Sequence, residues 1–275
     1  MKRIVFIVKH RPGPGRRISF AARMLLRGVK VSYAGTEADV KYNKENLYVT
    51  DDNGAYEKIA AQGGKALAIV EEDGARGART HAEYICTDVF EAEYKYFDEV
   101  WHRLNDLPME ILRTKRLILR ETTEADVDYF YEMYKDPKLT EFTEDLYDDP
   151  EEEKEYVRQY REKVYKVSIY GIYTVIRKKD KRVIGRVGTT VRQGFDEIEV
   201  GFVIGTDYQQ QGYAYEAMKA VLERMDGFGE TKRFALVMPG NVSSQALLKK
   251  LSFAMERETT VDGIEYQVWK DGNKQ

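Results

Sequence analysis

The sequence predicts two domains of different fold class, an α/β domain over residues 1–108 and an α+β domain over residues 109–275. In the first part of the chain, apolar strand patterns alternate with helical patterns, which indicates a small parallel sheet with helices on both faces. In the second part, three strand patterns follow one another before strands and helices alternate, which indicates a mixed, mostly antiparallel sheet. The two patterns meet near Pro108.

The first domain alternates strands with helices along its whole length. Asp52 suits the N-cap of the helix that follows it, and Gly63 and Gly64 end that helix. The run from Ala66 to Val70 is apolar throughout, as in a buried parallel strand. The predicted strands are 2–9, 29–33, 47–50, 65–70 and 84–87, and the predicted helices are 19–26, 52–62 and 91–105.

The second domain begins with a strand and two helices and continues with a meander of three strands. Asp262 followed by Gly263 is the residue pair of a type I′ turn, so a hairpin ends the domain. The predicted strands are 114–120, 170–177, 182–192, 197–204 and 233–238, and the predicted helices are 124–134, 152–167, one ending near 225, and 243–251.

Composition indicates a folded protein without a membrane-spanning segment. A hydrophobic share of 43% is enough to build two cores. The longest apolar runs are too short to cross a bilayer, and the strand-like start from Lys2 to Val8 lacks the pattern of a signal peptide. A single cysteine, Cys86, excludes an intramolecular disulfide. We therefore expect a cytoplasmic protein.

Charge and metal-ligating residues exclude several classes of partner. The net charge of −3 gives no global field that would attract nucleic acid or a membrane surface. His10, His81 and His102 are too scattered to predict a zinc site, and one cysteine cannot form a metal cluster. We expect no metal, no nucleic acid and no membrane as partners.

The most informative segment runs from Glu199 to Met218, where a buried strand is followed by a tight loop and a helix. No acidic residue occupies positions 212–215 at the start of that helix. Backbone amides and the positive end of the helix dipole therefore point at one small volume, which favours a phosphate. Gly212 lets the backbone approach a pyrophosphate where a Cβ would collide.

Three stretches resemble the GNAT acetyltransferases, in particular the branch of ribosomal-protein N-terminal acetyltransferases. They are Gln209-x-x-Gly212-x-Ala214, the opening Thr114-Lys-Arg-Leu-Ile-Leu-Arg120 with Asp126, and Asn241-x-x-Ser244-x-x-x-Leu248-x-Lys250-Leu251-x-Phe253. They occur in the order and at the separations of that family, over about residues 111–270. The resemblance implies an α+β GNAT domain that binds acetyl-CoA as the acetyl donor.

The resemblance also implies which residues hold the coenzyme. In the family, the strand at 197–204 separates from its neighbour, and the pantetheine arm pairs with it like an added strand. Asn241 matches the position that hydrogen-bonds the pantetheine. The coenzyme-binding residues implied in this way are Phe202, Val203, Ile204, Gln209, Gln210, Gln211, Gly212, Tyr213, Ala214, Asn241 and Ser244.

Acetyl transfer to an amine needs a base for the ammonium proton, and the departing thiolate needs a proton. Glu199 lies on the strand that lines the cleft and is the candidate base, with a solvated or ion-paired glutamate as the alternative. Many family members carry a tyrosine as the acid where this chain has Leu248. Ser244, another tyrosine or water must then protonate the thiolate, and Ser244 is our named catalytic candidate. Ser252 replaces a usual glycine, which affects the turn more than the chemistry.

An acidic segment between the first two helices of this domain favours a cationic acceptor. Residues 141–155 contain nine acidic residues and one lysine, which would attract a polyamine, an aminoglycoside or a basic peptide. The alternative is a solvated loop whose carboxylates stabilise the start of a helix. Four nearby tyrosines either line a pocket for a cation or pack as part of an amphipathic helix; they are Tyr129, Tyr131, Tyr134 and Tyr147.

The first domain gives less information about its role. The loop from Lys9 to Arg17 is rich in basic residues and lies at the carboxyl edge of the predicted sheet, where α/β domains bind ligands. It contains no known phosphate-binding pattern, so an anion site and a solvated loop both stay open. A sensing, interaction or dimerisation module fits this domain.

The sequence therefore predicts an N-acetyltransferase that moves an acetyl group from acetyl-CoA to a primary amine by direct attack in a ternary complex. A small cationic amine is the favoured acceptor. Acetylation of a protein N-terminus or lysine is one alternative, and a non-catalytic acyl-CoA sensor is another. The sequence leaves a homodimer open.

Overall fold

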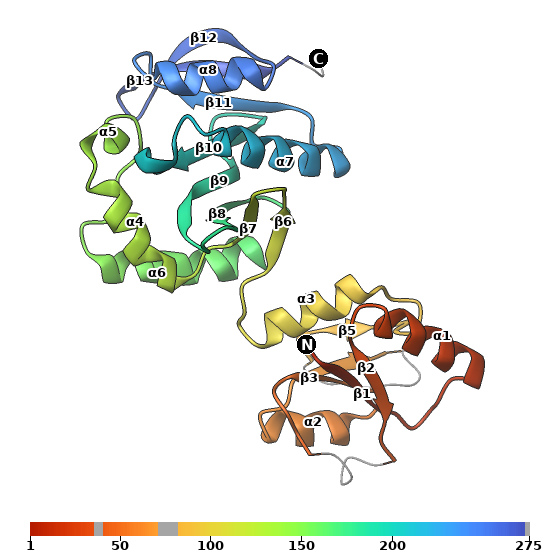
Figure 1. Cartoon of the computed structure of the whole chain (residues 1–275). Coiled ribbons are helices and arrows are strands. Elements are labelled where there is room, and N and C mark those ends of the chain that lie inside the picture. Colours follow the sequence, from red (N-terminus) through yellow and green to blue (C-terminus); the bar gives the residue numbers. More distant parts are fainter. Residues whose placement is uncertain (36–40, 71–81, 273–275) are drawn as a thin grey trace. The chain divides into compact units, whose positions relative to one another are not determined.

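The computed structural model describes residues 1–35, 41–70 and 82–272. The chain forms two compact units, Met1–Met109 and Glu110–Gln275, whose elements are labelled in Figure 1. Each unit has its own sheet, with five described strands in the first and eight in the second.

The sheet of the first unit has the strand order β2-β1-β3-β4-β5. All neighbouring strands that the structure describes in this sheet run parallel. The strands are β1 (Arg3–Ile7), β2 (Lys30–Tyr33), β3 (Asn46–Thr50), β4 (Ala66–Ile69) and β5 (Ile85–Cys86).

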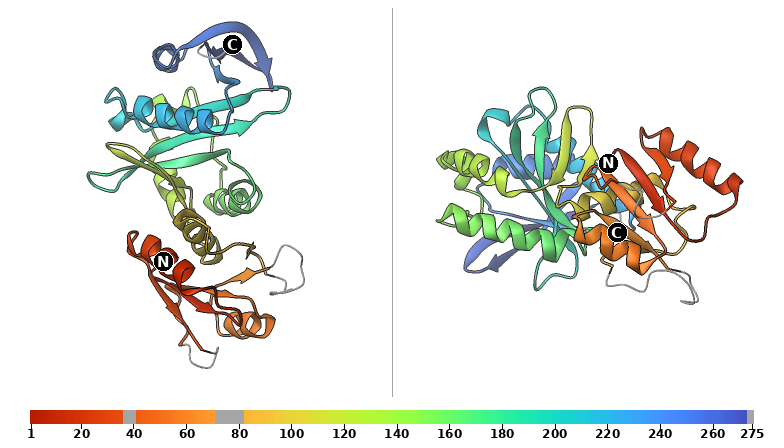
Figure 2. Two further views of the ribbon diagram at one scale, coloured as in Figure 1. Left: turned by 90° about the vertical axis from the view of Figure 1, so that its right-hand side faces the viewer. Right: turned by 90° about the horizontal axis from the view of Figure 1, so that it is seen from below.

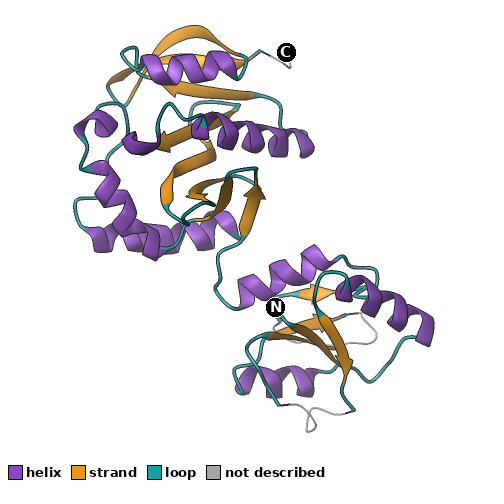
Figure 3. Cartoon of the chain, viewed as in Figure 1, coloured by secondary structure: helices purple, strands orange, loops and turns teal. Residues whose placement is uncertain are grey.

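Helices cover both faces of this parallel sheet, and Figure 3 distinguishes them from the strands by colour. On one face, Phe6 of β1 packs against Phe20, whose ring also contacts Phe97. On the other face, Val5 of β1 belongs to a smaller apolar cluster with Ile59. The predicted α/β class is therefore confirmed. The helices are α1 (Pro14–Leu25) and α3 (Tyr94–Leu104) on the first face and α2 (Asn53–Ala61) on the second.

The ends of two helices in the first unit can be compared with their predicted positions. Asp52 caps α2 as predicted, because its side chain accepts a hydrogen bond from the amide of Ala55 at 2.9 Å. The predicted start of α1 at residue 19 was wrong, since the helix begins at Pro14. Proline suits the first turn of a helix because its missing N–H is not needed there. Part of the basic loop is thus the first turn of α1.

The sheet of the second unit has the order β12-β13-β11-β10-β9-β8-β7-β6, and only the pair β10 and β11 runs parallel among its described strands. This confirms a mixed, mostly antiparallel sheet. The short strand β6 was not predicted. The strands are β6 (Glu110–Arg113), β7 (Leu117–Glu121), β8 (Gly171–Arg177), β9 (Val183–Val191), β10 (Ile198–Ile204), β11 (Arg233–Val237), β12 (Phe253–Val261) and β13 (Ile264–Asp271).

Helices lie on both faces of the second sheet, and Figure 2 gives two further views. Val200 and Ile204 of β10 share the core with α7 residues such as Met218. On the opposite face, the guanidinium of Arg186 in β9 lies 4.7 Å from the ring centre of Phe130 in α4. The helices are α4 (Val127–Tyr134), α5 (Pro137–Thr140), α6 (Pro150–Tyr160), α7 (Tyr213–Gly227) and α8 (Val242–Lys250).

A buried ion pair joins β11 to the last strand of the chain. Both side chains of the pair Arg233 and Asp271 are 3% exposed, and Arg233 also donates to the carbonyl of Leu222 at 2.9 Å. Asp271→Ala would remove this buried partner and leave Arg233 its pair with the more exposed Asp226 at 3.0 Å, so we expect the free energy of unfolding to fall by about 1.5–3 kcal/mol. Chemical denaturation measures this loss. Glu132→Ala, which breaks a surface pair with Lys135, should change stability little.

Candidate active site

The candidate site begins where β10 and β11 separate. Their parallel pairing consists of two residue pairs, Ile198 with Arg233 and Glu199 with Phe234, although β10 continues to Ile204. From Val200 onward, the side of β10 that faces β11 is therefore unpaired with that strand. The implied coenzyme contacts at 202–204 lie in this unpaired stretch.

The loop after β10 has the backbone geometry of an anion cradle. Gly212 is the N-cap of α7 and has a φ of 77°, and no side chain caps the helix. Gln210, two residues earlier, also has a positive φ of 56°. The first amides of α7 consequently have no side-chain acceptor, and the helix dipole adds positive potential at the same place.

The side chains of Gln209, Gln211 and Tyr213 have partners within the protein. The side-chain amide of Gln209 donates to the carbonyl of Ile204 at 2.9 Å, and that of Gln211 donates to the carbonyl of Asp207 at 2.9 Å. Both amides therefore brace the loop. Tyr213 is 9% exposed and its ring lies in the core, so only its backbone can face a ligand.

Arg116 is a loop-holding residue that the sequence argument missed. Its Nη1 donates to the carbonyl of Gln211 at 2.9 Å, and its Nε donates to Glu216 at 2.6 Å. An ideal Cβ on Gly212 would lie 3.5 Å from Nη2 of Arg116. The opening stretch of the domain is thereby joined to the first turn of α7. Arg116 lies in one of the stretches that carry the resemblance and Glu216 lies two residues after another, but spacing alone did not predict that they pair.

Glu199 is placed on the face of β10 opposite to α7, because side chains alternate along the strand and Val200 faces the α7 core. The residue is 8% exposed, and its Oε2 accepts a hydrogen bond from Nε of Arg192 at 2.5 Å. Burial raises the pKa of Glu199, and the Arg192 guanidinium opposes that rise. No hydrogen bond from a described residue reaches Oε1, so this oxygen could accept a proton from a ligand.

Asn241 and Ser244 lie at the start of α8, beyond the separation of the two strands. Oδ1 of Asn241 accepts from the amide of Ser244 at 3.0 Å and from the hydroxyl of Ser243 at 2.9 Å. The asparagine is therefore the N-cap of the helix, and its Nδ2 is the group that could donate to a ligand. Leu248 is fully buried in the core, so no proton donor occupies its position.

Most carboxylates of the acidic segment 141–155 have partners within the chain. Asp149 caps α6, and four others pair with cations: Glu144 with Arg192, Glu151 with Lys154, Glu153 with Arg186, and Glu155 with Arg158. Two of the tyrosine hydroxyls have partners within the chain, since Tyr131 donates to the carbonyl of Tyr147 and Tyr134 accepts from Arg186. The segment therefore carries less free negative charge than its composition indicates.

The segment also reaches the far end of the separated strands. Its residue Phe142 lies against Gly240, where an ideal Cβ would be 3.1 Å from the ring. Glu144, two residues on, pairs with Arg192 at 3.0 Å next to Glu199. Through Glu144, the acidic segment thus reaches the face of the sheet on which Glu199 lies.

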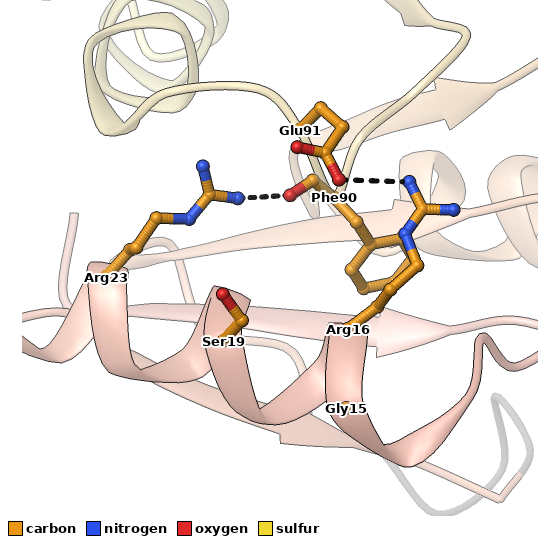
Figure 4. Close-up of a pocket in the computed structure, with 6 residues that line it drawn as sticks. All are labelled: Gly15, Arg16, Ser19, Arg23, Phe90 and Glu91. Atoms are coloured by element: carbon orange, nitrogen blue, oxygen red, sulfur yellow. Dashed lines mark hydrogen bonds and ion pairs between the residues drawn. The ribbon is translucent and has the colours of Figure 1, made fainter.

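Several groups of the basic loop and of α1 have hydrogen-bond partners within the first unit. The amides of Lys9 and His10 donate to Asp51 at 2.8 and 3.0 Å. A cavity of about 280 Å³ lies beside α1. Its lining includes Arg16, which reaches Glu91, and Arg23, which reaches the carbonyl of Phe90 (Figure 4). Its lining residues are Gly15, Arg16, Ser19, Arg23, Phe90 and Glu91.

Metal-ligating side chains do not gather in either described unit. Within residues 1–35, 41–70 and 82–272, no group of three histidine, cysteine or acidic side chains is placed to hold a metal ion. His81, one of the three histidines considered in the sequence, lies outside the described residues. In the same described part of the chain, no helix is long and apolar enough to cross a membrane.

Comparison with known families decides the class of the second unit. The acetyltransferase (GNAT) domain family matches residues 116–254, about half of the chain. The chain belongs to the GNAT acetyltransferase family. The predicted GNAT fold and the predicted acyltransferase class are therefore confirmed.

Relatives in sequence agree with this assignment to the GNAT family. The chain is 28% identical over 148 residues to the uncharacterized N-acetyltransferase YnaD of Bacillus subtilis, covering 53% of this chain and 83% of that protein. It is 28% identical over 153 residues to the uncharacterized N-acetyltransferase p20 of Bacillus licheniformis, covering 54% and 84%.

Two solved structures share the fold of the GNAT domain. The ribosomal-protein-S5-alanine acetyltransferase from Vibrio fischeri has a TM-score of 0.50 at 20% identity, and the match covers 62% of this chain and all of that one. RimL, a ribosomal L7/L12 alpha-N-protein acetyltransferase solved in complex with coenzyme A, has a TM-score of 0.50 at 14% identity, covering 59% and 97%.

Proposed function

We propose that this chain transfers an acetyl group from acetyl-CoA to a primary amine, with a small cationic amine as the favoured acceptor. The observation that carries the proposal is the combination of two features at one place. Gly212 opens α7 with uncapped amides, and β10 is unpaired with β11 directly before that loop. Phosphates suit the first feature and an extended pantetheine arm suits the second.

The residues support direct attack by the amine. Acetyl-CoA supplies a thioester, which a neutral amine can attack. Glu199 takes the ammonium proton through Oε1, while Arg192 holds Oε2. Ser244 or water returns a proton to the departing sulfur, since the buried Leu248 cannot. Asn241 orients the pantetheine through Nδ2, because its Oδ1 caps α8.

The test combines binding with turnover in the full chain. We expect acetyl-CoA to bind in calorimetry and free thiol to appear when a polyamine, an aminoglycoside or a basic peptide is added. Binding and turnover with the small amines support the proposal. Turnover with peptides alone would favour the protein acetyltransferase alternative, and tight binding without turnover on any amine would favour the sensor. No binding by folded protein would contradict all three.

A further prediction concerns Gly201, which lies between Glu199 and Val203 on the same face of β10. A Cβ added there would meet no atom within 4 Å, so the space in front of it is open. We expect Gly201→Val to fill the acceptor space and lower kcat/KM for the amine by about tenfold to a hundredfold. Acetyl-CoA affinity should stay within a factor of a few. Gly227→Val, also in open space, is the matched control and should keep full activity.

The first unit is, in our proposal, a separate domain with an interaction or sensing role. Its sheet and cores form without residues of the second unit. We accordingly place all residues of acetyl transfer in the second unit.

A further inference from the structure

Arg192 lies directly after β9 and connects two carboxylates from distant parts of the chain. Its Nε donates to Oε2 of Glu199 at 2.5 Å, and its Nη2 donates to Oε1 of Glu144 at 3.0 Å. One guanidinium therefore joins the candidate base on the sheet to the acidic segment.

The two bonds of Arg192 differ in their surroundings. The side chain of Glu199 is 11% exposed and that of Arg192 is 26% exposed, whereas that of Glu144 is 73% exposed. A buried charge pair holds its geometry, because breaking it leaves an uncompensated charge away from water. An exposed pair exchanges readily with water and other cations. Arg192 is thus fixed to Glu199 and loosely tied to Glu144.

The charges of this cluster are one positive short of balance. Glu144 and Glu199 carry two negative charges, and Arg192 supplies one positive charge. An ammonium group beside them would complete the balance, and the open space in front of Gly201 lies on the same face. A monovalent cationic amine fits this arrangement better than an anionic acceptor.

We propose that Arg192 is a positioning residue for acetyl transfer to such an amine, holding Glu199 with Oε1 turned to the acceptor and holding Glu144 close to Glu199. The inference rests on the proposed function. The acceptor ammonium takes the position between the two carboxylates and loosens the exposed bond to Glu144. The buried bond to Glu199 persists through the reaction.

Two other titratable groups in the described part of the chain lie near this cluster. Burial raises the pKa of Tyr266 in β13, and the charges of Glu144, Arg192 and Glu199 also act on its hydroxyl. Glu197, two residues from Glu199 on the same face, is paired with Lys270 at 2.7 Å. Without Arg192, burial and the charge of Glu144 both favour protonated Glu199, so its pKa should rise further.

The test compares three variants of the full chain, Arg192→Met, Arg192→Lys and Glu144→Gln. For Arg192→Met, we expect the acid limb of kcat/KM to move to higher pH, so that the relative rate at pH 6 falls on the order of tenfold. Lysine keeps the charge but cannot reproduce the forked geometry. Arg192→Lys should therefore leave the limb near its place and raise KM for the amine.

Glu144→Gln isolates the exposed bond. We expect it to raise KM for a cationic amine several-fold with kcat nearly unchanged, while acetyl-CoA affinity stays constant. Glu141→Gln is the matched control, since this carboxylate belongs to the same segment and Arg192 is bonded to Glu144 and Glu199 instead. A control that raised KM equally would show that general charge, not the Arg192 tie, attracts the amine, and would overturn that part of the proposal.

The ionisation of Glu199 can also be followed without turnover, by carbon NMR of glutamate carboxyl groups assigned through Glu199→Gln. A titration that moves upward in Arg192→Met supports the inference even where no acceptor is known. A titration that stays in place in folded Arg192→Met overturns it, whatever the activity. If the NMR titration moves but the acid limb does not, Glu199 is not the base, and the proposed mechanism fails instead.

Discussion

Gly212→Glu is expected to abolish measurable binding of acetyl-CoA. Gly212 has a φ of 77° and opens α7 with amides that no side chain caps. A carboxylate there opposes the pyrophosphate and claims the same amides. Loss of two hydrogen bonds to a charged group corresponds to roughly a hundredfold or more in affinity. Calorimetric titration of the wild type and the variant measures the effect directly.

Backbone strain must be separated from the loss of the cradle. Gly229 has a φ of 81°, and a Cβ there would meet no atom within 4 Å. Gly229→Glu therefore introduces the same unfavourable backbone region and the same charge away from the loop. It should bind acetyl-CoA like the wild type. If both variants lose binding equally, the loop at Gly212 is not the phosphate site.

Glu199→Gln should have the largest effect on the chemical step. We expect kcat to fall by about 10²- to 10⁴-fold, because glutamine cannot accept the ammonium proton. Acetyl-CoA affinity should not change, since Glu199 lies on the face away from α7. The glutamine carbonyl can still accept from Nε of Arg192, so the fold should be retained.

The pH dependence follows from the same carboxylate. Burial raises the pKa of Glu199 above that of an ordinary glutamate, against the opposing effect of Arg192. Because the base must be deprotonated, activity should rise with pH through this pKa, with the limb above the usual glutamate range. Glu197→Gln is the control, as this residue lies on the same face but is paired with Lys270. Equal losses in both variants would contradict a specific role for Glu199.

Much of the fold followed from local pattern. A few neighbouring residues determine the period of the strands and helices, the cap at Asp52 and the final turn. In that turn, Asp262 and Gly263 have positive φ of 51° and 81°. The start of α1 was not predicted because glycine and proline among basic residues are typical of an irregular loop. Strand β6 was not predicted because its four residues, two exposed and two half-buried, carry little periodic signal.

The candidate site also contains residues that the sequence could place and residues that it could not. Gly212, Asn241 and Glu199 stand in recognisable stretches, so sequence placed them on the right elements. Arg192 and Arg116 act through partners that are brought close only by register and packing. Arg192 lies on the same face as Glu199 because Thr190, two residues earlier, pairs with Glu199. That register depends on the length of the turn between β9 and β10, which the sequence pattern does not give. No pattern in the acidic segment distinguishes Glu144 from its eight acidic neighbours.

The short pairing between β10 and β11 divides the large sheet into two leaves. Strands β6 to β10 form one leaf and β11 to β13 the other, and two residue pairs act as the hinge between them. A coenzyme lying between the leaves would replace the missing rungs of the ladder. Binding of the coenzyme would then also stabilise the domain. We expect the C-terminal leaf to unfold locally most easily when no coenzyme is bound.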